Sequence, residues 1–151
     1  MDKIYKFLAT AAYTGLLPRM PGTWGSIFGA LFVYFVFSKF SLSLKIILIL
    51  LFTLLGIISS YKVSKNLNNK DPDIVVIDEF VGILLTFLFV PVNLESLVLG
   101  TILFRIIDIL KPFPLKKLEK YPYGIGIMLD DIAAGLISGL ILYGLFKFFN
   151  F

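Results

Sequence analysis

The feature that most constrains this chain is a series of apolar stretches that carry no charge. Five such stretches recur along it, namely Trp24–Ser38, Ile46–Tyr61, Phe80–Leu94, Ser96–Phe104 and Ile132–Phe146. Charged residues make up 16% of the 151 positions, against about 25% in a typical soluble chain. A water-soluble fold of this composition would expose more apolar surface than such proteins tolerate. The pattern therefore predicts an all-α integral membrane protein.

Most of these stretches are shorter than the roughly 20 residues that a helix needs to cross a bilayer. The third reaches that length only if its helix begins near Ile74 and includes Asp78 and Glu79. The fourth does so only by including Arg105 and Asp108. We expect one membrane-embedded domain over residues 1–151, folded as a compact bundle of about five transmembrane helices.

The N-terminal segment Lys3–Leu17 is too short to span a membrane and is flanked by Lys. Thr, Tyr and Gly interrupt its apolar run, which is not typical of a cleaved signal peptide. We expect it to form an interfacial helix.

Basic residues predict the orientation of the bundle. With five spans, one side receives Lys3, Lys6, Arg19, Lys62, Lys65, Lys70, Lys111, Lys116, Lys117 and Lys120. The other side receives Lys39, Lys45 and Lys147. Because Lys and Arg concentrate in cytoplasmic loops, we expect the N-terminus in the cytoplasm and the C-terminus outside.

The chain contains no His and no Cys. This excludes a phosphohistidine intermediate, a Ser–His triad, cysteine nucleophiles and zinc sites built from imidazole or thiolate. Any hydrolytic chemistry must use carboxylates, Arg, Lys, hydroxyl groups and hard metal ions.

Five carboxylates and one guanidinium are predicted to converge at one membrane depth. They lie near the cytoplasmic ends of three predicted spans and are Asp78, Glu79, Arg105, Asp108, Asp130 and Asp131. Placing an ionisable group in a membrane costs about 2.5–3.5 kcal/mol on insertion scales. We therefore favour a functional site over the alternative that these six charges merely lie at the headgroup level. Clustered carboxylates repel one another unless a cation lies among them, and oxygen ligands favour Mg²⁺. We expect the five carboxylates to bind Mg²⁺, with the role of a base that orients the attacking water as the alternative for Asp108, and all six groups to be catalytic.

Arg105 has two interpretations that can both hold. It can bind phosphate oxygens in a bidentate manner, or form a salt bridge that keeps Asp108 buried.

A second candidate element precedes the first span. Pro and Gly interrupt the chain there, and the N-terminus of the following helix offers free N–H groups to an anion. An ordinary helix cap at Thr23 or Ser26 explains the same residues. The predicted phosphate-binding set is Arg19, Pro21, Gly22, Thr23, Ser26, Arg105 and Lys111.

Two pairs of glycines at a spacing of four, Gly25 with Gly29 and Gly135 with Gly139, allow close helix approach. We expect packing inside one chain, with a homodimer as the alternative.

Four sequence blocks together resemble the bacterial phosphatidylglycerophosphatase A family. They are Pro-Gly-Thr-Trp-Gly-Ser at 21–26, Asp-Glu-Phe-Val-Gly at 78–82, Phe-Arg-Ile-Ile-Asp-Ile-Leu-Lys-Pro at 104–112, and Gly-Ile-Met-Leu-Asp-Asp-Ile-Ala-Ala-Gly at 126–135. The resemblance runs from about Phe7 to the last span. It implies Mg²⁺-dependent removal of the terminal phosphate from phosphatidylglycerophosphate, at the cytoplasmic face of the bacterial inner membrane. The family's acidic residues would map onto Asp78, Glu79, Asp108, Asp130 and Asp131, with Arg105 beside them. The expected partners are this substrate and membrane lipids, and no nucleic acid.

Other functions stay open at this point. A phosphatase for another phospholipid or a polyprenyl phosphate would show the same charge pattern. A cation-coupled transporter would need polar groups at the midplane, where only scattered Thr and Ser are available. A non-catalytic lipid-binding subunit would tolerate exchange of the carboxylates for amides. We expect attack by water rather than an aspartyl-phosphate, since no aspartyl-phosphatase loop is recognisable.

Overall fold

The computed structural model describes residues 2–113, 115–122 and 124–149, and within these ranges it contains helices and no strands. The α-helices are α1 (Lys3–Ala9), α2 (Pro21–Phe35), α3 (Leu42–Leu67), α4 (Ile77–Thr86), α5 (Leu94–Leu110) and α6 (Gly124–Phe149). Short 3-10 helices cover Thr14–Leu16, Phe37–Lys39 and Leu115–Lys120. The predicted all-α class is confirmed.

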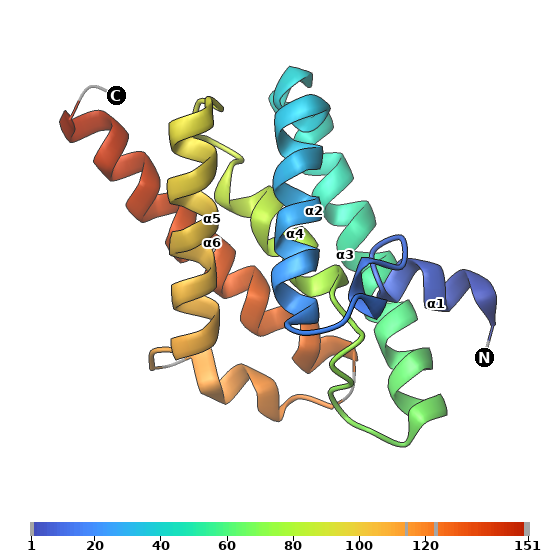
Figure 1. Cartoon of the computed structure of the whole chain (residues 1–151). Coiled ribbons are helices and arrows are strands. Elements are labelled where there is room, and N and C mark those ends of the chain that lie inside the picture. The colour runs from blue at the N-terminus through green and yellow to red at the C-terminus, as the bar shows by residue number, and fades with distance from the viewer. Residues whose placement is uncertain (1, 114, 123, 150–151) are drawn as a thin grey trace.

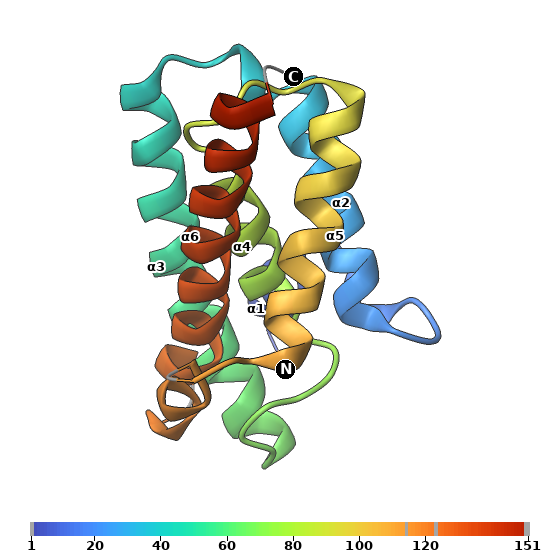
Figure 2. The same ribbon diagram turned by 90° about the vertical axis from the view of Figure 1, so that its left-hand side faces the viewer.

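The short helix α4 forms the centre of the bundle. It packs against α2, α3, α5 and α6, and eight of its ten residues are buried. Figure 1 shows the longer helices around it, running between the same two ends of the molecule in alternating directions. Figure 2, turned by 90°, shows α4 enclosed between α3 and α6 on one side and α2 and α5 on the other.

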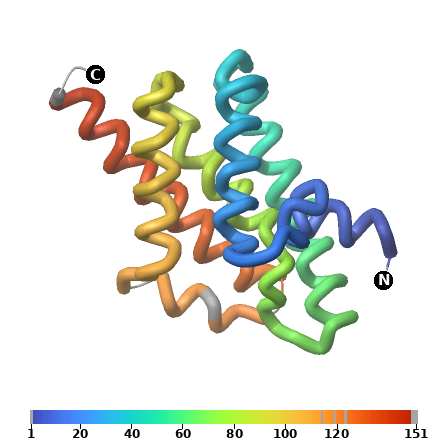
Figure 3. Tube along the Cα trace, viewed as in Figure 1, coloured from blue at the N-terminus to red at the C-terminus, as the bar shows by residue number. Residues whose placement is uncertain are grey.

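One end of the bundle, which we call the site end, is where α2, α4 and α6 begin and α3 and α5 end. The connections, residues 68–76 and the described residues 111–113 and 115–122, both run across this end, as the tube in Figure 3 shows. They carry Lys70, Lys111, Lys116, Lys117 and Lys120, which the sequence predicts on the cytoplasmic side.

Within the described residues, three helical segments are long and apolar enough to cross a membrane: Pro21–Lys39, Leu42–Leu67 and Gly124–Phe148. The prediction of about five spans is therefore not confirmed. The predicted third span is shorter than expected because α4 ends at Thr86 and residues 87–93 are not helical. Ten residues extend about 15 Å, half of the roughly 30 Å hydrocarbon core. Helix α5 has 17 residues, which is the lower limit of the usual range of about 17–25 residues.

The N-terminal segment folds as a short helix followed by turns. Figure 1 shows α1 lying across the direction of the long helices, and it packs on α3. Its position at a membrane interface stays a prediction.

Glycines bring α4 and α6 into backbone contact. A Cβ on Gly135 would overlap the carbonyl of Gly82, and one on Gly139 would lie 3.0 Å from the carbonyl oxygen of Thr86. The hydroxyl of Thr86 donates hydrogen bonds to the carbonyls of Gly82 (2.9 Å) and Gly135 (3.4 Å). The predicted packing of these glycines inside the chain is confirmed. Since Asp131 precedes Gly135 by one turn, this contact brings its carboxylate next to the start of α4.

Candidate active site

A cavity of about 350 Å³ opens at the site end of the bundle. Its walls come from the start of α2, the connection before α4, the start of α4, the end of α5 and the first turns of α6. It is lined by Met20, Pro21, Gly22, Asp71, Pro72, Asp73, Val75, Asp78, Glu79, Arg105, Asp108, Ile109, Lys111, Ile127, Asp130 and Asp131. All six predicted catalytic residues therefore line one cavity.

Three of the carboxylates form a compact group. Asp78, Glu79 and Asp131 each present a carboxylate oxygen, and the three oxygens lie within 4.8 Å of one another. Among the described residues, Asp78 Oδ1, Glu79 Oε2 and Asp131 Oδ2 are buried without a hydrogen-bond partner. Buried polar atoms in folded proteins almost always have a partner. Three converging carboxylates, each with an unsatisfied oxygen, fit a hard divalent cation.

The electrostatics of the group lead to the same conclusion. Burial raises the pKa of Asp78 well above its ordinary value, and the charges of Glu79 and Asp131 raise it further. Burial also raises the pKa of Glu79, with partial compensation from its hydrogen bond to Asp78 and from Arg105. Without a cation these carboxyl groups retain protons at a higher pH than usual, and a bound cation would favour their charged form. The positive N-terminal end of α4 also favours the charged form of Asp78 and Glu79, since both residues lie in the first turn of this helix.

The other two acidic residues are each paired with a basic side chain. Arg105 Nη1 lies 2.6 Å from Asp108 Oδ2 and 3.6 Å from Glu79 Oε1. Lys111 Nζ lies 2.6 Å from Asp130 Oδ2. The structure thus separates the five predicted metal ligands into a group of three that converge and two, Asp108 and Asp130, that hold cationic side chains over the same cavity.

Gly22 makes the contact between α2 and the charged group. A Cβ at this position would overlap Glu79 Oε1 and lie 3.1 Å from Arg105 Nη1. Any side chain here would displace the carboxylate or the guanidinium. The predicted role of Gly22 therefore depends on the absence of its side chain as much as on its backbone.

Four of the predicted phosphate-binding residues line the cavity, namely Pro21, Gly22, Arg105 and Lys111. Three do not line it: Arg19, Thr23 and Ser26. The buried Ser26 hydroxyl donates to the carbonyl of Gly22 at 2.8 Å, and the carbonyl of Arg19 accepts from Trp24 Nε1 at 3.1 Å.

The predicted helix cap at Thr23 or Ser26 is wrong. Met20, in a left-handed conformation, is the N-cap of α2, so both hydroxyls lie inside the helix. A hydroxyl in that position commonly bonds the carbonyl four residues earlier, as Ser26 does.

Sequence reasoning missed several residues of the cavity, including Asp71, Asp73, Met20 and Ile109. The acidic sequence Asp-Pro-Asp at 71–73 was a detectable signal because it directly precedes a predicted span. Met20 and Ile109 gave none, since apolar residues beside a span are common.

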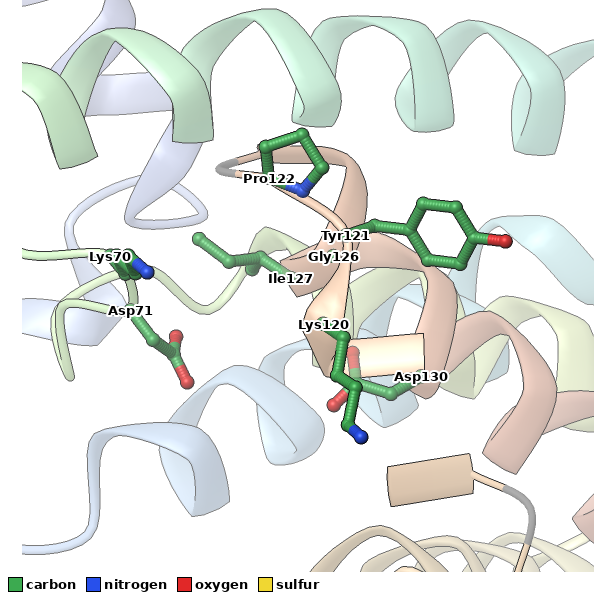
Figure 4. A pocket seen from close by; sticks show the side chains of 8 residues that line it. All are labelled: Lys70, Asp71, Lys120, Tyr121, Pro122, Gly126, Ile127 and Asp130. Carbon is green, nitrogen blue, oxygen red and sulfur yellow. The ribbon is translucent and has the colours of Figure 1, made fainter. Parts of the chain in front are cut away.

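A second cavity of about 520 Å³ adjoins the first and shares Asp71, Ile127 and Asp130 with it. Figure 4 shows Lys70 and Asp71 on one side of this cavity and Lys120 on the other, with Ile127 between them. Its rim is charged and exposed, so the two cavities give the carboxylate group a polar route to the surface.

Comparison with known proteins connects the site to a family. The family model described as "Phosphatidylglycerophosphatase A" matches residues 7–146. A protein of that name from Escherichia coli is 32% identical over 145 residues, covering 95% of this chain and 84% of the relative. Another from Haemophilus influenzae is 32% identical over 140 residues, covering 91% and 86%.

A third relative carries a different name. This Bacteroides thetaiotaomicron protein, provisionally named a phosphatidylinositol-3-phosphatase, is 33% identical over 142 residues, covering 89% of each chain. No solved structure matches the chain significantly.

Proposed function

The chain belongs to the phosphatidylglycerophosphatase A family and is a phosphatase, and we propose that it hydrolyses phosphatidylglycerophosphate to phosphatidylglycerol and inorganic phosphate. The observation that carries the proposal is the group of three carboxylate oxygens within 4.8 Å of one another, in a chain of this family. Phosphoryl transfer needs positioning and charge stabilisation more than a protein nucleophile. The cavity offers both through its carboxylates and its two basic side chains.

The proposed metal ligands are Asp78, Glu79 and Asp131, and the proposed metal is Mg²⁺. Carboxylate oxygens are the ligands that Mg²⁺ binds in phosphate-handling sites, usually with several waters retained. When bound, such an ion polarises a phosphoryl oxygen and activates water. Each of the three residues has a buried carboxylate oxygen without a hydrogen-bond partner, which suits it to bind the ion.

Arg105 and Lys111 are the proposed phosphate-binding residues. Both line the cavity, and a guanidinium can hold two phosphoryl oxygens at once. Asp108 and Asp130 then serve as positioning residues that hold these cations in the absence of substrate. The contact of 2.6 Å between the guanidinium and the carboxylate suits Asp108 to orienting Arg105.

The reaction is proposed to be direct hydrolysis. The oxygen of water bonds to the terminal phosphorus, and the bond between this phosphorus and the glycerol oxygen breaks. The departing oxygen takes up a proton, so that phosphatidylglycerol and inorganic phosphate are the products. Arg105 and Lys111 stabilise the negative charge on the phosphoryl oxygens during the transfer.

The cytoplasmic face of the bacterial inner membrane is the proposed location of the site. The cavity lies at the same end as the last turns of α3, which carry Lys62 and Lys65, and as the connections, which carry Lys70, Lys111, Lys116, Lys117 and Lys120. A positive-inside orientation would turn this end toward the cytoplasm. The phosphate could then reach the carboxylates while the acyl chains stay in the bilayer.

For the headgroup of the lipid substrate, a second candidate has specific support. The Bacteroides relative carries the name of a phosphatase for a phosphoinositide, which also presents a terminal phosphomonoester on a phospholipid. Phosphatidylglycerophosphate is preferred because the family model and two relatives carry its name.

A transporter is less consistent with the arrangement of charge. The four buried acidic residues in the described ranges, Asp78, Asp108, Asp130 and Asp131, all line the one cavity. A cation pathway would need polar groups beyond it, toward the other end of the bundle.

The proposal is tested by measuring phosphate release from phosphatidylglycerophosphate by the purified protein in detergent. We expect release with Mg²⁺, loss with excess chelator and recovery when Mg²⁺ is restored. Release that persists in chelator would contradict the metal assignment. No release from a folded protein, together with release from a phosphoinositide, would replace the substrate while leaving the enzyme class intact.

A further inference from the structure

The rim of the 350 Å³ cavity has an apolar side that the proposed chemistry does not use. Two of the lining residues are both apolar and well exposed, Met20 at 65% and Ile109 at 63%. Met20 is the N-cap of α2, and Ile109 lies in the last turn of α5. The other exposed lining residues, Asp71 and Asp73, are acidic. The cavity therefore opens between an apolar lip and a polar one.

Each residue of the apolar lip continues into a stripe of exposed apolar side chains. On α2 the stripe is Met20, Trp24, Ile27 and Leu31, and on α5 it is Ile102, Ile106 and Ile109. Positions three, four and seven residues apart share one face of a helix. Both stripes thus begin at the cavity and run along their helices away from the site end.

The two stripes lie on neighbouring helices. Helices α2 and α5 contact each other; α4 lies behind them in Figure 1 and to one side of both in Figure 2. The charged start of α4 is therefore reached from the side where α2 and α5 meet.

The other two long helices do not offer such a lip. Helix α3 contributes no residue to the cavity, and α6 contributes only the buried side chains of Ile127, Asp130 and Asp131. The exposed apolar residues of α3 and α6, such as Leu54 and Leu140, are ordinary lipid-facing positions in a membrane helix. The adjoining cavity has Lys70, Asp71 and Lys120 on its exposed rim, which suits water and inorganic phosphate rather than acyl chains.

We propose that the acyl chains of the phospholipid substrate lie against the exposed stripes of α2 and α5, and that its headgroup passes between Met20 and Ile109 into the cavity. This inference rests on the proposed function, since it requires a substrate that is a lipid. It assigns a lateral opening on one side of the bundle, where the chains remain in hydrocarbon while the terminal phosphate reaches Arg105 and the carboxylate group. An apolar chain loses nothing by moving from lipid to an apolar helix face, so the cost of access falls on the headgroup alone.

The first test maps the acyl chains directly. The probe is a non-hydrolysable phosphonate analogue of phosphatidylglycerophosphate with a photoreactive diazirine in one acyl chain, used with the purified full-length chain in lipid nanodiscs. We expect labelling of residues 20–31 and 102–109 that excess phosphatidylglycerophosphate competes away. Labelling of α3 around Leu54 should resist competition because it reports bulk lipid. Competed labelling on α3 or α6 in place of α2 and α5 would overturn the proposal.

The second test narrows the opening with a matched control. Ile109→Trp enlarges the lip, and Leu54→Trp makes a similar change on α3 at a residue of similar exposure, 61%. For the long-chain lipid we expect Ile109→Trp to raise KM about tenfold with kcat within twofold, and Leu54→Trp to change neither. An equal loss of kcat in Ile109→Trp would point to damage at the reacting groups and overturn the assignment.

The two proposals can fail separately. Intact phosphate release by the unmodified protein with the wrong labelling pattern would overturn the lateral opening alone. Absence of phosphate release and of any competed labelling would overturn the proposed function, and the lateral opening with it.

Discussion

At the residue scale, the cavity separates acidic side chains that look equivalent in the sequence. Asp130 and Asp131 are adjacent, yet one carboxylate bonds Lys111 at 2.6 Å and the other joins Asp78 and Glu79. Successive residues on a helix point about 100° apart. Their roles should therefore differ when each is changed alone.

Asp131→Asn is expected to lower Mg²⁺-dependent phosphate release by at least about 100-fold, because it removes one of three converging oxygen ligands. The matched control is Asp73→Asn, an exposed carboxylate that lines the same cavity outside the group of three, which should keep activity within about twofold. Calorimetric titration with Mg²⁺ should show weakened binding for Asp131→Asn alone. Full activity in Asp131→Asn would contradict its assignment as a ligand.

The group of Asp78, Glu79 and Asp131 also predicts that a substitution can abolish activity and at the same time stabilise the fold. Asp78→Asn removes a buried carboxylate whose pKa burial and like charges raise. Such a group destabilises the fold increasingly as pH rises through its unfolded pKa toward its folded one. We therefore expect the metal-free variant to be more stable than the parent at pH 8, by about 1 kcal/mol or more, while it is inactive. Thermal unfolding in chelator at pH 8 and pH 5 measures this, and the difference should shrink at pH 5.

Gly22→Ala should displace Glu79 or Arg105, because the new Cβ would overlap Glu79 Oε1. We expect phosphate release to fall by about tenfold or more with the melting temperature little changed, since the carboxylate is a movable group. Gly144→Ala is the control, because a Cβ there meets nothing within 4 Å. Equal activity in the two variants would show that the close approach of α2 has no functional role.

At the element scale, α4 decides the shape of the site although it is too short to cross the bundle. Its first turn carries Asp78 and Glu79, and its body packs against α6 through Gly82 and Gly135. The contact between two backbones fixes the distance between the first turn of α4 and Asp131. Stability and the geometry of the carboxylate group therefore depend on the same pair of glycines.

Gly135→Ala is expected to destabilise the protein by about 1–3 kcal/mol, because the added methyl group would overlap backbone atoms of Gly82 that cannot rotate away. Gly144→Ala on the same helix should be neutral or stabilising by up to about 1 kcal/mol, from the higher helix propensity of Ala. Unfolding followed by circular dichroism in detergent compares the two. Similar stabilities would mean that α4 and α6 are further apart than the structure has them.

At the scale of the whole molecule, the charged residues that line the cavity gather at the site end, while the exposed helix faces stay apolar. Residues 68–76, 111–113 and 115–122 run across that end, and their basic residues predict which side of the membrane it faces. The absence of cysteine from the sequence provides a direct means to test this orientation, because any introduced cysteine is the sole thiol.

Asn69→Cys, in an exposed turn at the site end, and Ser43→Cys, near the start of α3 at the opposite end, are both exposed. We expect a membrane-impermeant maleimide added to intact spheroplasts to label Ser43→Cys, and to label Asn69→Cys only after permeabilisation. The reverse pattern would place the carboxylate cavity outside the cell and contradict the proposed location.

The sequence by itself determined the class of the fold and the residue types available for chemistry. Charge-free apolar stretches can satisfy their backbone groups in lipid only as helices or closed barrels, and their length and continuity favour helices. The lack of His and Cys left carboxylates as the ligands. The position of six charged groups near the same ends of three predicted spans was also enough to predict that they meet, as they do in one cavity.

Only the tertiary structure decided which of these groups act together. The division into Asp78, Glu79 and Asp131 on one hand, and the ion pairs of Asp108 and Asp130 on the other, depends on distances between helices. Those distances follow from side-chain packing, above all the close approach at Gly22 and Gly135, which periodicity does not encode. The sequence did not reveal the early end of α4 at Thr86 for a related reason. In an apolar segment that neighbouring helices bury, hydropathy stays high beyond the residue where the helix stops, so hydropathy does not mark the helix end.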